Sequence, residues 1–352
     1  HPVRAYWGDG TEDWYKFRYN LLTASNIWKA LSSQAYINSL IYEKCKPLNL
    51  NKHQSINTET PFHWGQKYEP VSVLIYEDKY KTRVEDFGCI KDESHHFLGA
   101  SPDGINVDPN SSHYGRMLEI KNRVSDSVPI TGNPKRDYWI QMQFQMGVCR
   151  LNECDFLETR FIEYDSKADF DADGTFTKTE DGKQKGIFMC FMIDGKLEYV
   201  YPPLNLSQRL FTHWENEQFS KNEKDNHEWI CNCYWKLEKM SCVLVLRNET
   251  WFNKAVETVK PIWDIIVKER VEGYEHRAPI KRTKTISECE RESNTNNTSN
   301  TNTLFDCGPW KKINSLAQSK KTPKTPKTPK NSGCLIDIPS LIVTPHPNEL
   351  TN

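Results

Sequence analysis

The sequence lacks the features that would place it in several common classes of protein. It has no apolar run long enough to span a membrane, and no secretory signal sequence is recognised at its start. It contains no Walker-type glycine loop, so it does not predict ATP hydrolysis. The formal net charge of the 352 residues is only −1, so the overall charge does not indicate a particular partner.

The cysteines also lack a regular framework. There are eleven, an odd number, and they are scattered along a chain whose hydrophobic content of 37% is sufficient for a sizeable core. Long chains with such cysteine usage are typical of reducing compartments, so we expect an intracellular protein without a membrane anchor.

The composition of the chain changes near residue 275. The tracts NTNNTSNTNT and KTPKTPKTPK beyond it are low in complexity and cannot bury a core. From Arg277 onward there are twelve Lys and Arg but six Asp and Glu. We predict a folded domain over residues 1–275 and a disordered basic tail over 276–352. The tail is either a solvated segment without a task or a salt-sensitive tether for nucleic acid.

Hydrophobic patterns within the predicted domain alternate between helical and strand periods. Helices are expected over residues 22–33, 61–80, 137–150 and 251–272, the last kinked or restarted at Pro261. Strands are expected over residues 87–90, 97–101, 117–122 and 156–164, followed by a hairpin over 186–203 that turns at Asp194-Gly195. This order predicts an α/β fold with a mixed central β-sheet flanked by helices.

An acid and a base lie inside the apolar strand predicted over residues 117–122. Glu119 and Lys121 are two positions apart and share one face of the strand, while Leu118 and Ile120 point into the core on the other. Taken alone, a Glu and a Lys in a strand are ordinary, and a surface hairpin explains them as well as a functional site does.

An aspartate stands at a bend before this strand. Asp103 lies between Pro102 and Gly104, just after the strand predicted over residues 97–101. If the two strands pair as a hairpin, Asp103 approaches Glu119. Two carboxylates at such a short distance repel each other unless a cation lies between them. Mg²⁺ is the cation that proteins usually bind with such a pair. The pair therefore indicates a Mg²⁺ site, with Mn²⁺ as a substitute.

The complete arrangement resembles the PD-(D/E)xK nuclease superfamily, and more closely its phage lambda exonuclease and YqaJ-like viral recombinase branch. Five elements match in order over about residues 10–165, namely DWYKFRYNLLTASN, WGQKYEP, GASPDG, LEIK and YWIQMQFQM. The resemblance implies a restriction-endonuclease-like core that carries the motifs, completed by a C-terminal hairpin and helices over residues 186–272. One departure is visible: the family often has Cys-Pro after E-x-K, where this chain has Asn122-Arg123.

The resemblance implies catalytic and metal-binding roles for the residues of these motifs. Asp103 and Glu119 would bind the metal together with the backbone carbonyl of Ile120. Lys121 would position the attacking water. Gln141 would lie on the helix behind the site.

Three further residues receive roles from the resemblance, each with an ordinary alternative. Glu69 would reach the metal site through water or a second ion, or is a solvated helix residue. Arg18 would grip the 5′-phosphate of a DNA end, with Ser25 as a second contact, because a guanidinium forks onto phosphate oxygens. Alternatively, Arg18 is a surface residue. The face that Gln141 shares with Tyr138 and Gln145 either lines the site or is the polar side of its helix.

The function implied by the resemblance is a Mg²⁺-dependent exonuclease that digests linear double-stranded DNA. Digestion would run 5′→3′ and leave 5′-phosphate products, for recombination, repair or replication of viral or phage DNA. Implied partners are a single-strand annealing protein and further copies in a ring trimer, in the host cytoplasm or at a viral replication site. Two alternatives stay open: a structure-specific or site-specific endonuclease of the same superfamily, and a catalytically silent DNA-binding protein.

Overall fold

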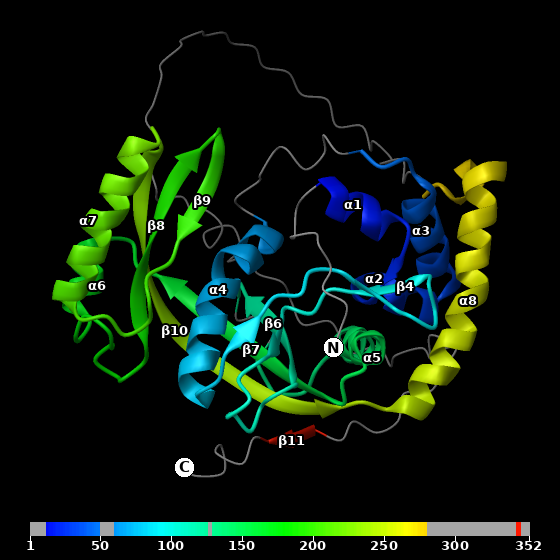
Figure 1. Ribbon diagram of the computed structural model, residues 1–352, viewed down its shortest axis with the longest axis horizontal. Helices are drawn as coiled ribbons and strands as arrows, with labels where there is room; N and C mark the ends of the chain where they lie inside the picture. The colour runs from blue at the N-terminus through cyan, green and yellow to red at the C-terminus, as the bar shows by residue number, and fades with distance from the viewer. Residues whose placement is uncertain (1–11, 50–59, 126–128, 280–342, 346–352) are drawn as a thin grey trace, which may run out of the picture. The chain divides into compact units, whose positions relative to one another are not determined.

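The computed structural model describes residues 12–49, 60–125, 129–279 and 343–345 (Figure 1). The chain divides into two compact units, one formed by residues 1–277 with 332–352 and the other by residues 278–331. All described helices and strands belong to the first unit. Most of the tail predicted over residues 276–352 lies outside the described residues, so its disorder stays a prediction.

An eight-stranded sheet forms the centre of the first unit. Among its described pairs, β6 and β7 run parallel and the others antiparallel. In spatial order its strands are β2 (Val84–Glu85), β5 (Gly104–Asn106), β6 (Met117–Arg123), β7 (Glu153–Glu163), β10 (Glu228–Leu246), β8 (Lys185–Ile193) and β9 (Lys196–Val200), and β11 (Val343–Pro345) pairs with β10. The predicted α/β fold with a mixed central sheet is confirmed.

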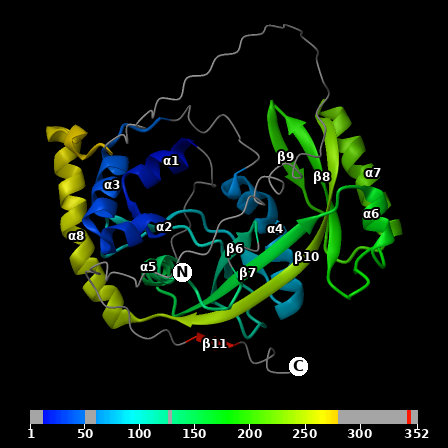
Figure 2. The same ribbon diagram turned by 180° about the vertical axis from the view of Figure 1, so that it is seen from behind.

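Helices flank this sheet in the described ranges. They are α1 (Glu12–Tyr19), α2 (Ala24–Ile27), α3 (Gln34–Cys45), α4 (Pro61–Tyr80), α5 (Arg136–Cys149), α6 (Lys167–Ala172), α7 (Gln208–Lys224) and α8 (Glu249–Glu272), with 3-10 turns at Trp28–Leu31 and Glu275–Arg277. Figures 1 and 2 show α8 beside α3, and α6 and α7 beside β8. None of these helices has the length and apolar character needed to span a bilayer.

Both faces of the central strands are covered, because alternate residues of a strand point to opposite sides. Leu118 and Ile120 of β6 pack with Tyr76 of α4 on one face. Met117 packs on the other face in the largest apolar cluster, which includes residues of α5. Glu119 shares the face of Met117, so it points towards α5 and is buried rather than projecting from an open surface.

A second, three-stranded sheet consists of β1 (Leu22–Thr23), β4 (Leu98–Ala100) and β3 (Ile90–Lys91). The predicted hairpin between residues 97–101 and β6 is wrong, because β4 pairs with β1 and β3 instead. The partner of β6 is β5, where Gly104 lies opposite Leu118. Asp103 immediately precedes β5, so the true hairpin still brings it to Glu119.

Local sequence explains why α4 begins where the pattern predicts. The side chain of Thr60 accepts a hydrogen bond from the backbone N–H of His63 at 3.1 Å, which caps the helix. Pro61 suits the first turn, where a backbone N–H has no helical partner. Pro70 lies inside the helix without ending it. The predicted turn of the β8–β9 hairpin is also confirmed, with positive φ at Asp194 and Gly195.

Two other predicted helices differ from the structure. Residues 22–33 form β1, α2 and a 3-10 turn, because Leu22 and Thr23 pair in parallel with β4. The last helix, α8, continues through Pro261 rather than restarting there.

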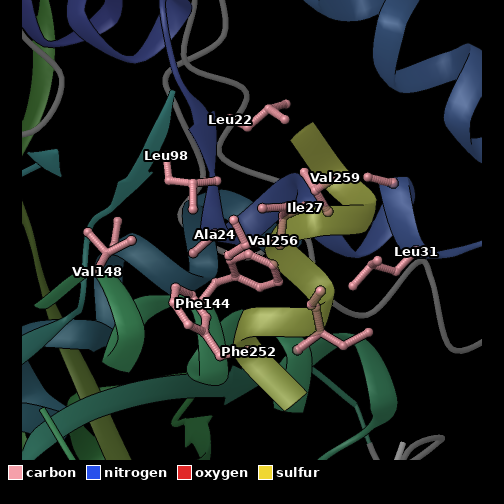
Figure 3. Close-up of a cluster of buried hydrophobic side chains, with 14 of the residues drawn as sticks. Leu22, Ala24, Ile27, Leu31, Leu98, Phe144, Val148, Phe252, Val256 and Val259 are labelled. Carbon is pink, nitrogen blue, oxygen red and sulfur yellow. The ribbon is translucent and has the colours of Figure 1, made fainter. Parts of the chain in front are cut away.

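The largest apolar cluster joins α2, α5 and α8. Figure 3 shows Ile27 of α2, Phe144 of α5, and Phe252 and Val256 of α8 among its members. Ile27 and Phe144 are almost fully buried. Burial of this kind stabilises the fold by about 1.5–3 kcal/mol per large side chain. The cluster therefore ties α8, which lies beyond the motif-bearing residues, to the helix that backs the site.

Candidate active site

Four of the predicted site residues meet where β5 and β6 pair. Asp103 precedes β5, and its Oδ2 accepts a hydrogen bond from the backbone N–H of Ile120 at 2.6 Å. Glu119 and Lys121 flank Ile120 on β6, and the Lys121 ammonium donates to Glu119 Oε1. The prediction that these residues form one cluster matches their placement.

Glu119 is the most enclosed member of the cluster. Its side chain is 0% exposed, yet both oxygens have donors. Oε1 accepts from Gln141 Nε2 at 2.6 Å as well as from Lys121, and Oε2 accepts from Gln145 Nε2 at 2.7 Å. A buried carboxylate is tolerated when it is paired and hydrogen-bonded in this way. The helical face that carries the two glutamines therefore lines the site.

Asp103 lies in an environment that disfavours its charge. Burial raises the pKa of Asp103 well above its ordinary value, and the charges of Glu119 and then Glu69 raise it further. Lys121 and the N–H of Ile120 act in the opposite direction. Glu69 of α4 thus acts on Asp103 through its charge. Three mutually repelling carboxylates favour a bound cation.

The donor set fits a hard divalent cation. Asp103 and Glu119 supply two carboxylates, and the backbone carbonyl of Ile120 belongs to the residue directly after Glu119. No group of three or more His, Cys, Asp or Glu in the described part of the chain is arranged to hold a metal by itself. A small number of protein ligands is sufficient for Mg²⁺. This ion usually retains several waters and is bound by one or two carboxylates together with substrate phosphate.

Lys121 stays charged beside these acids. Burial alone would lower the pKa of Lys121, but the carboxylates of Glu119 and Asp103 outweigh it, and the net shift is upward. The Lys121 Nζ also lies 5.2 Å from the ring centroid of Tyr138, one helical turn before Gln141. The ammonium is thus held between the acids and an aromatic face.

The two residues that depart from the family pattern make structural contacts. Asn122 donates to the backbone carbonyl of Gly65 at 3.0 Å, and its Oδ1 accepts from Ser72 at 2.7 Å. Arg123 donates to Glu158 of β7 and to the hydroxyl of Tyr138. These bonds fix β6 to α4, α5 and β7, so the departure strengthens the scaffold of the site.

Arg18 and Ser25 form a second group beside the first. Arg18 Nη1 donates to Ser101 Oγ at 2.6 Å, Nη2 reaches Ser25 Oγ at 3.4 Å, and the guanidinium lies 4.3 Å from the Trp14 ring centroid. Ser101 lies two positions before Asp103 and was not predicted as a site residue. Its place in the GASPDG motif is the signal that could have revealed it.

The C-terminal end of α1 is anchored by two basic side chains from other helices. Lys44 Nζ donates to the backbone carbonyls of Arg18 at 2.9 Å and Leu21 at 2.6 Å. Arg270 of α8 donates to the carbonyls of Tyr19 at 2.7 Å and Lys44 at 2.9 Å. Lys and Arg side chains can hydrogen-bond to the last carbonyls of a helix. These contacts hold the backbone that presents Arg18.

The motifs and this geometry define a domain class. Residues 13–152 match the YqaJ-like viral recombinase domain family. The matched region runs from α1 to just past the end of α5, so this similarity covers the same motif-bearing residues as the resemblance.

A relative and two solved structures show similarity over most of the chain. The chain is 26% identical over 300 residues to Uncharacterized protein R354 of Acanthamoeba polyphaga mimivirus, covering 73% of this chain and 52% of that protein. It thus spans about half the length of this relative. An alkaline exonuclease from Laribacter hongkongensis is 17% identical, with 74% of this chain and 94% of that chain covered and a TM-score of 0.42. A phage-related exonuclease from Haemophilus somnus is 11% identical, with 73% and 96% covered and a TM-score of 0.36.

Proposed function

We propose that the protein is a metal-dependent deoxyribonuclease that digests linear duplex DNA from its ends. Digestion runs 5′→3′ and releases products with 5′-phosphates. The observation that carries the proposal is the cluster of Asp103, Lys121 and the buried Glu119 at one strand junction. The YqaJ-like domain that contains it supports DNA as the substrate.

The cluster suits the needs of phosphodiester hydrolysis. Mg²⁺, or Mn²⁺ in its place, held by Asp103, Glu119 and the Ile120 carbonyl would neutralise phosphate charge and activate water. Glu119 is already oriented by its hydrogen bonds, so little reorganisation is needed during the reaction. Lys121 keeps its charge and can orient the attacking water and offset the phosphate charge. Glu69 adds negative charge from α4, which further favours the cation.

Arg18, Ser25 and Ser101 support a preference for ends. Two hydroxyls lie within hydrogen-bond distance of one guanidinium, which suits the oxygens of a terminal phosphate. A terminal phosphate held there keeps the strand in a fixed register relative to the acids. An internal phosphodiester offers fewer oxygens to the same group, so this arrangement favours an exonuclease over an endonuclease.

The biological setting is inferred from the same resemblance. Digestion of one strand exposes a 3′ overhang, which suits recombination or repair with a single-strand annealing protein. The mimivirus relative supports a viral setting, in the host cytoplasm or at a viral replication site. Assembly into a ring trimer is part of this proposal and is tested by the mass of the purified protein in solution.

Digestion of matched linear and closed-circular duplexes tests the activity. The protein with Mg²⁺ should degrade the linear duplex to mononucleotides and leave the circle intact. Cleavage of both forms would identify the endonuclease alternative. Binding without cleavage of either would identify the silent DNA-binding protein.

A further inference from the structure

One buried glutamine connects the two groups of the site. Gln145 lies on α5, four positions after Gln141, and is 1% exposed. Its Nε2 donates to Glu119 Oε2 at 2.7 Å and to the backbone carbonyl of Ser101 at 3.1 Å. Both partners are acceptors, so only the amide nitrogen can face them, and the orientation of the amide is fixed by its surroundings.

The connection continues to the guanidinium. The hydroxyl of Ser101 accepts from Arg18 Nη1, while the carbonyl of the same residue accepts from Gln145. A continuous path of hydrogen bonds therefore runs from Arg18 through Ser101 and Gln145 to Glu119. Both hydrogens of one amide group are used, one towards each group of the site.

This orientation of the Gln145 amide leaves its oxygen without a hydrogen bond among the described residues, which destabilises the fold. Gln145 Oε1 is buried and accepts no hydrogen bond within the described residues. A buried acceptor without a partner destabilises a fold. Retention of glutamine at this place is explained if the two donated bonds matter for the site.

We propose that Gln145 is a positioning residue that couples the grip on the 5′-phosphate to the orientation of Glu119. The inference rests on the proposed function. A phosphate that engages Arg18 changes the hydrogen bonding of Ser101, and Gln145 transmits the position of the Ser101 carbonyl to the Glu119 carboxylate. An end that carries a phosphate is then cleaved faster because the acid is better placed, and not only because the end binds more tightly.

The chain supplies a matched control on the same helix. Gln143 is 0% exposed, two positions from Gln145. It donates to the carbonyl of Leu246 at 2.9 Å and accepts from the N–H of Asn248 at 2.7 Å, so it joins α5 to the β10–α8 corner. Gln143→Met removes a buried amide with two bonds, as Gln145→Met does, but no bond to either group of the site.

The test compares Gln145→Met with Gln143→Met on duplexes that end in 5′-phosphate or 5′-hydroxyl. Maximal cleavage rates with Mg²⁺ and end affinities without divalent metal are measured for each. In the native protein, kcat should favour phosphorylated ends by about tenfold or more. Gln145→Met should lose most of this kcat ratio while its affinity for phosphorylated ends stays within about twofold of native. Gln143→Met should keep the native ratio, even where its melting temperature falls.

Several results would overturn the inference. An unchanged kcat ratio in Gln145→Met, or an equal loss of the ratio in Gln143→Met, shows that Gln145 has no coupling role. If Gln145→Met does not melt cooperatively, Gln145→Asn, which stays polar but is too short to reach both partners, gives the same decision. If the native protein cleaves 5′-phosphate and 5′-hydroxyl ends equally fast, the coupling is refuted but the proposed nuclease activity is not. Native protein that cleaves neither end removes the proposed function as well.

Discussion

The carboxylate of Asp103 accepts a 2.6 Å hydrogen bond from the backbone N–H of Ile120, seventeen positions further along the chain. Ile120 stands between Glu119 and Lys121, so this single bond sets the aspartate beside both. The pairing of β5 with β6 makes the bond possible, because Gly104 lies opposite Leu118. The arrangement of the acids is thus a property of backbone pairing and does not depend on mobile side chains.

Asp103→Ala and Glu119→Ala should each lower the cleavage rate more than about a hundredfold, since even outer partners of metal ligands typically contribute 10–100-fold. DNA affinity measured by fluorescence anisotropy should stay close to native, because the acids repel phosphate rather than bind it. Glu93→Ala is the control, because Glu93 is exposed and paired with Arg150 away from the cluster. Substantial cleavage by Glu119→Ala contradicts the assignment.

Lys121→Met should slow cleavage on the order of a hundredfold at saturating DNA, because no other ammonium is paired with Glu119 among the described residues. Lys67→Met is the matched control: Lys67 is also mostly buried and paired with a glutamate, but its partner is Glu163 rather than an acid of the cluster. It should lower the melting temperature and leave the cleavage rate per folded molecule unchanged. Equal loss of rate in both variants would argue against a catalytic role for Lys121.

Arg18→Ala should remove most of the preference for phosphorylated ends. Charge-assisted bonds to phosphate contribute about 1.5–3 kcal/mol, which corresponds to roughly ten- to a hundredfold in rate or affinity. Rates on 5′-hydroxyl ends and the binding of Mn²⁺ should be unaffected, because Arg18 contacts Ser101 and Ser25 rather than the acids. A preference that survives in Arg18→Ala would place the phosphate elsewhere.

Lys44 should make stability rise with pH above neutrality. Burial, then the charges of Arg18 and Arg270, lower the pKa of Lys44 from 10.5 to about 7. Between these values the unfolded chain binds a proton that the folded protein does not, so the free energy of unfolding increases with pH. Urea denaturation at about pH 7 and pH 8.5 should show a smaller increase for Lys44→Met than for the native protein. An equal increase in the free energy of unfolding between the two pH values for Lys44→Met and the native protein would show that Lys44 is charged in the folded protein at pH 8.5.

Truncation after Ala278 should preserve the domain. Arg277 donates to Glu269 and Asn38 and closes the end of α8 against α3, so the cut must follow it. Cleavage of short duplexes should be unchanged, while affinity for long DNA should fall, most visibly at low salt. A melting temperature lower by more than about 5 °C would show that the pairing of β11 with β10 contributes to stability.

Local patterns predicted the elements whose limits are set by neighbouring residues. Hydrophobic spacing predicted α4, whose start is fixed locally by the cap at Thr60, and the Asp194-Gly195 pair predicted the turn between β8 and β9. Local patterns could not predict elements that depend on distant partners. Leu22 and Thr23 form a strand because β4 lies beside them, and the 19-residue β10 is held by β7 and β8 together. α7 was missed because it buries few apolar residues, chiefly Phe211.

The residues of the site likewise divide into those that local motifs could predict and those that depend on distant contacts. Asp103, Glu119 and Lys121 were identified from order and spacing and Gln141 from the family resemblance, and the structure brings the four together. Ser101 was missed because its contact with Arg18 joins residues 83 positions apart. Spacing on one strand face likewise could not show that α5 covers Glu119, since this depends on how the helix packs on the sheet.

Mg²⁺ titration into metal-free protein with a linear 5′-phosphorylated duplex tests the central claim most directly. The measured quantity is the rate of mononucleotide release, for the native protein and for Glu119→Gln, which keeps the size of the side chain but removes its charge. The account predicts release that rises with Mg²⁺ in the native protein and stays near background in Glu119→Gln. Release that persists in excess chelator, or that Glu119→Gln retains, would contradict it.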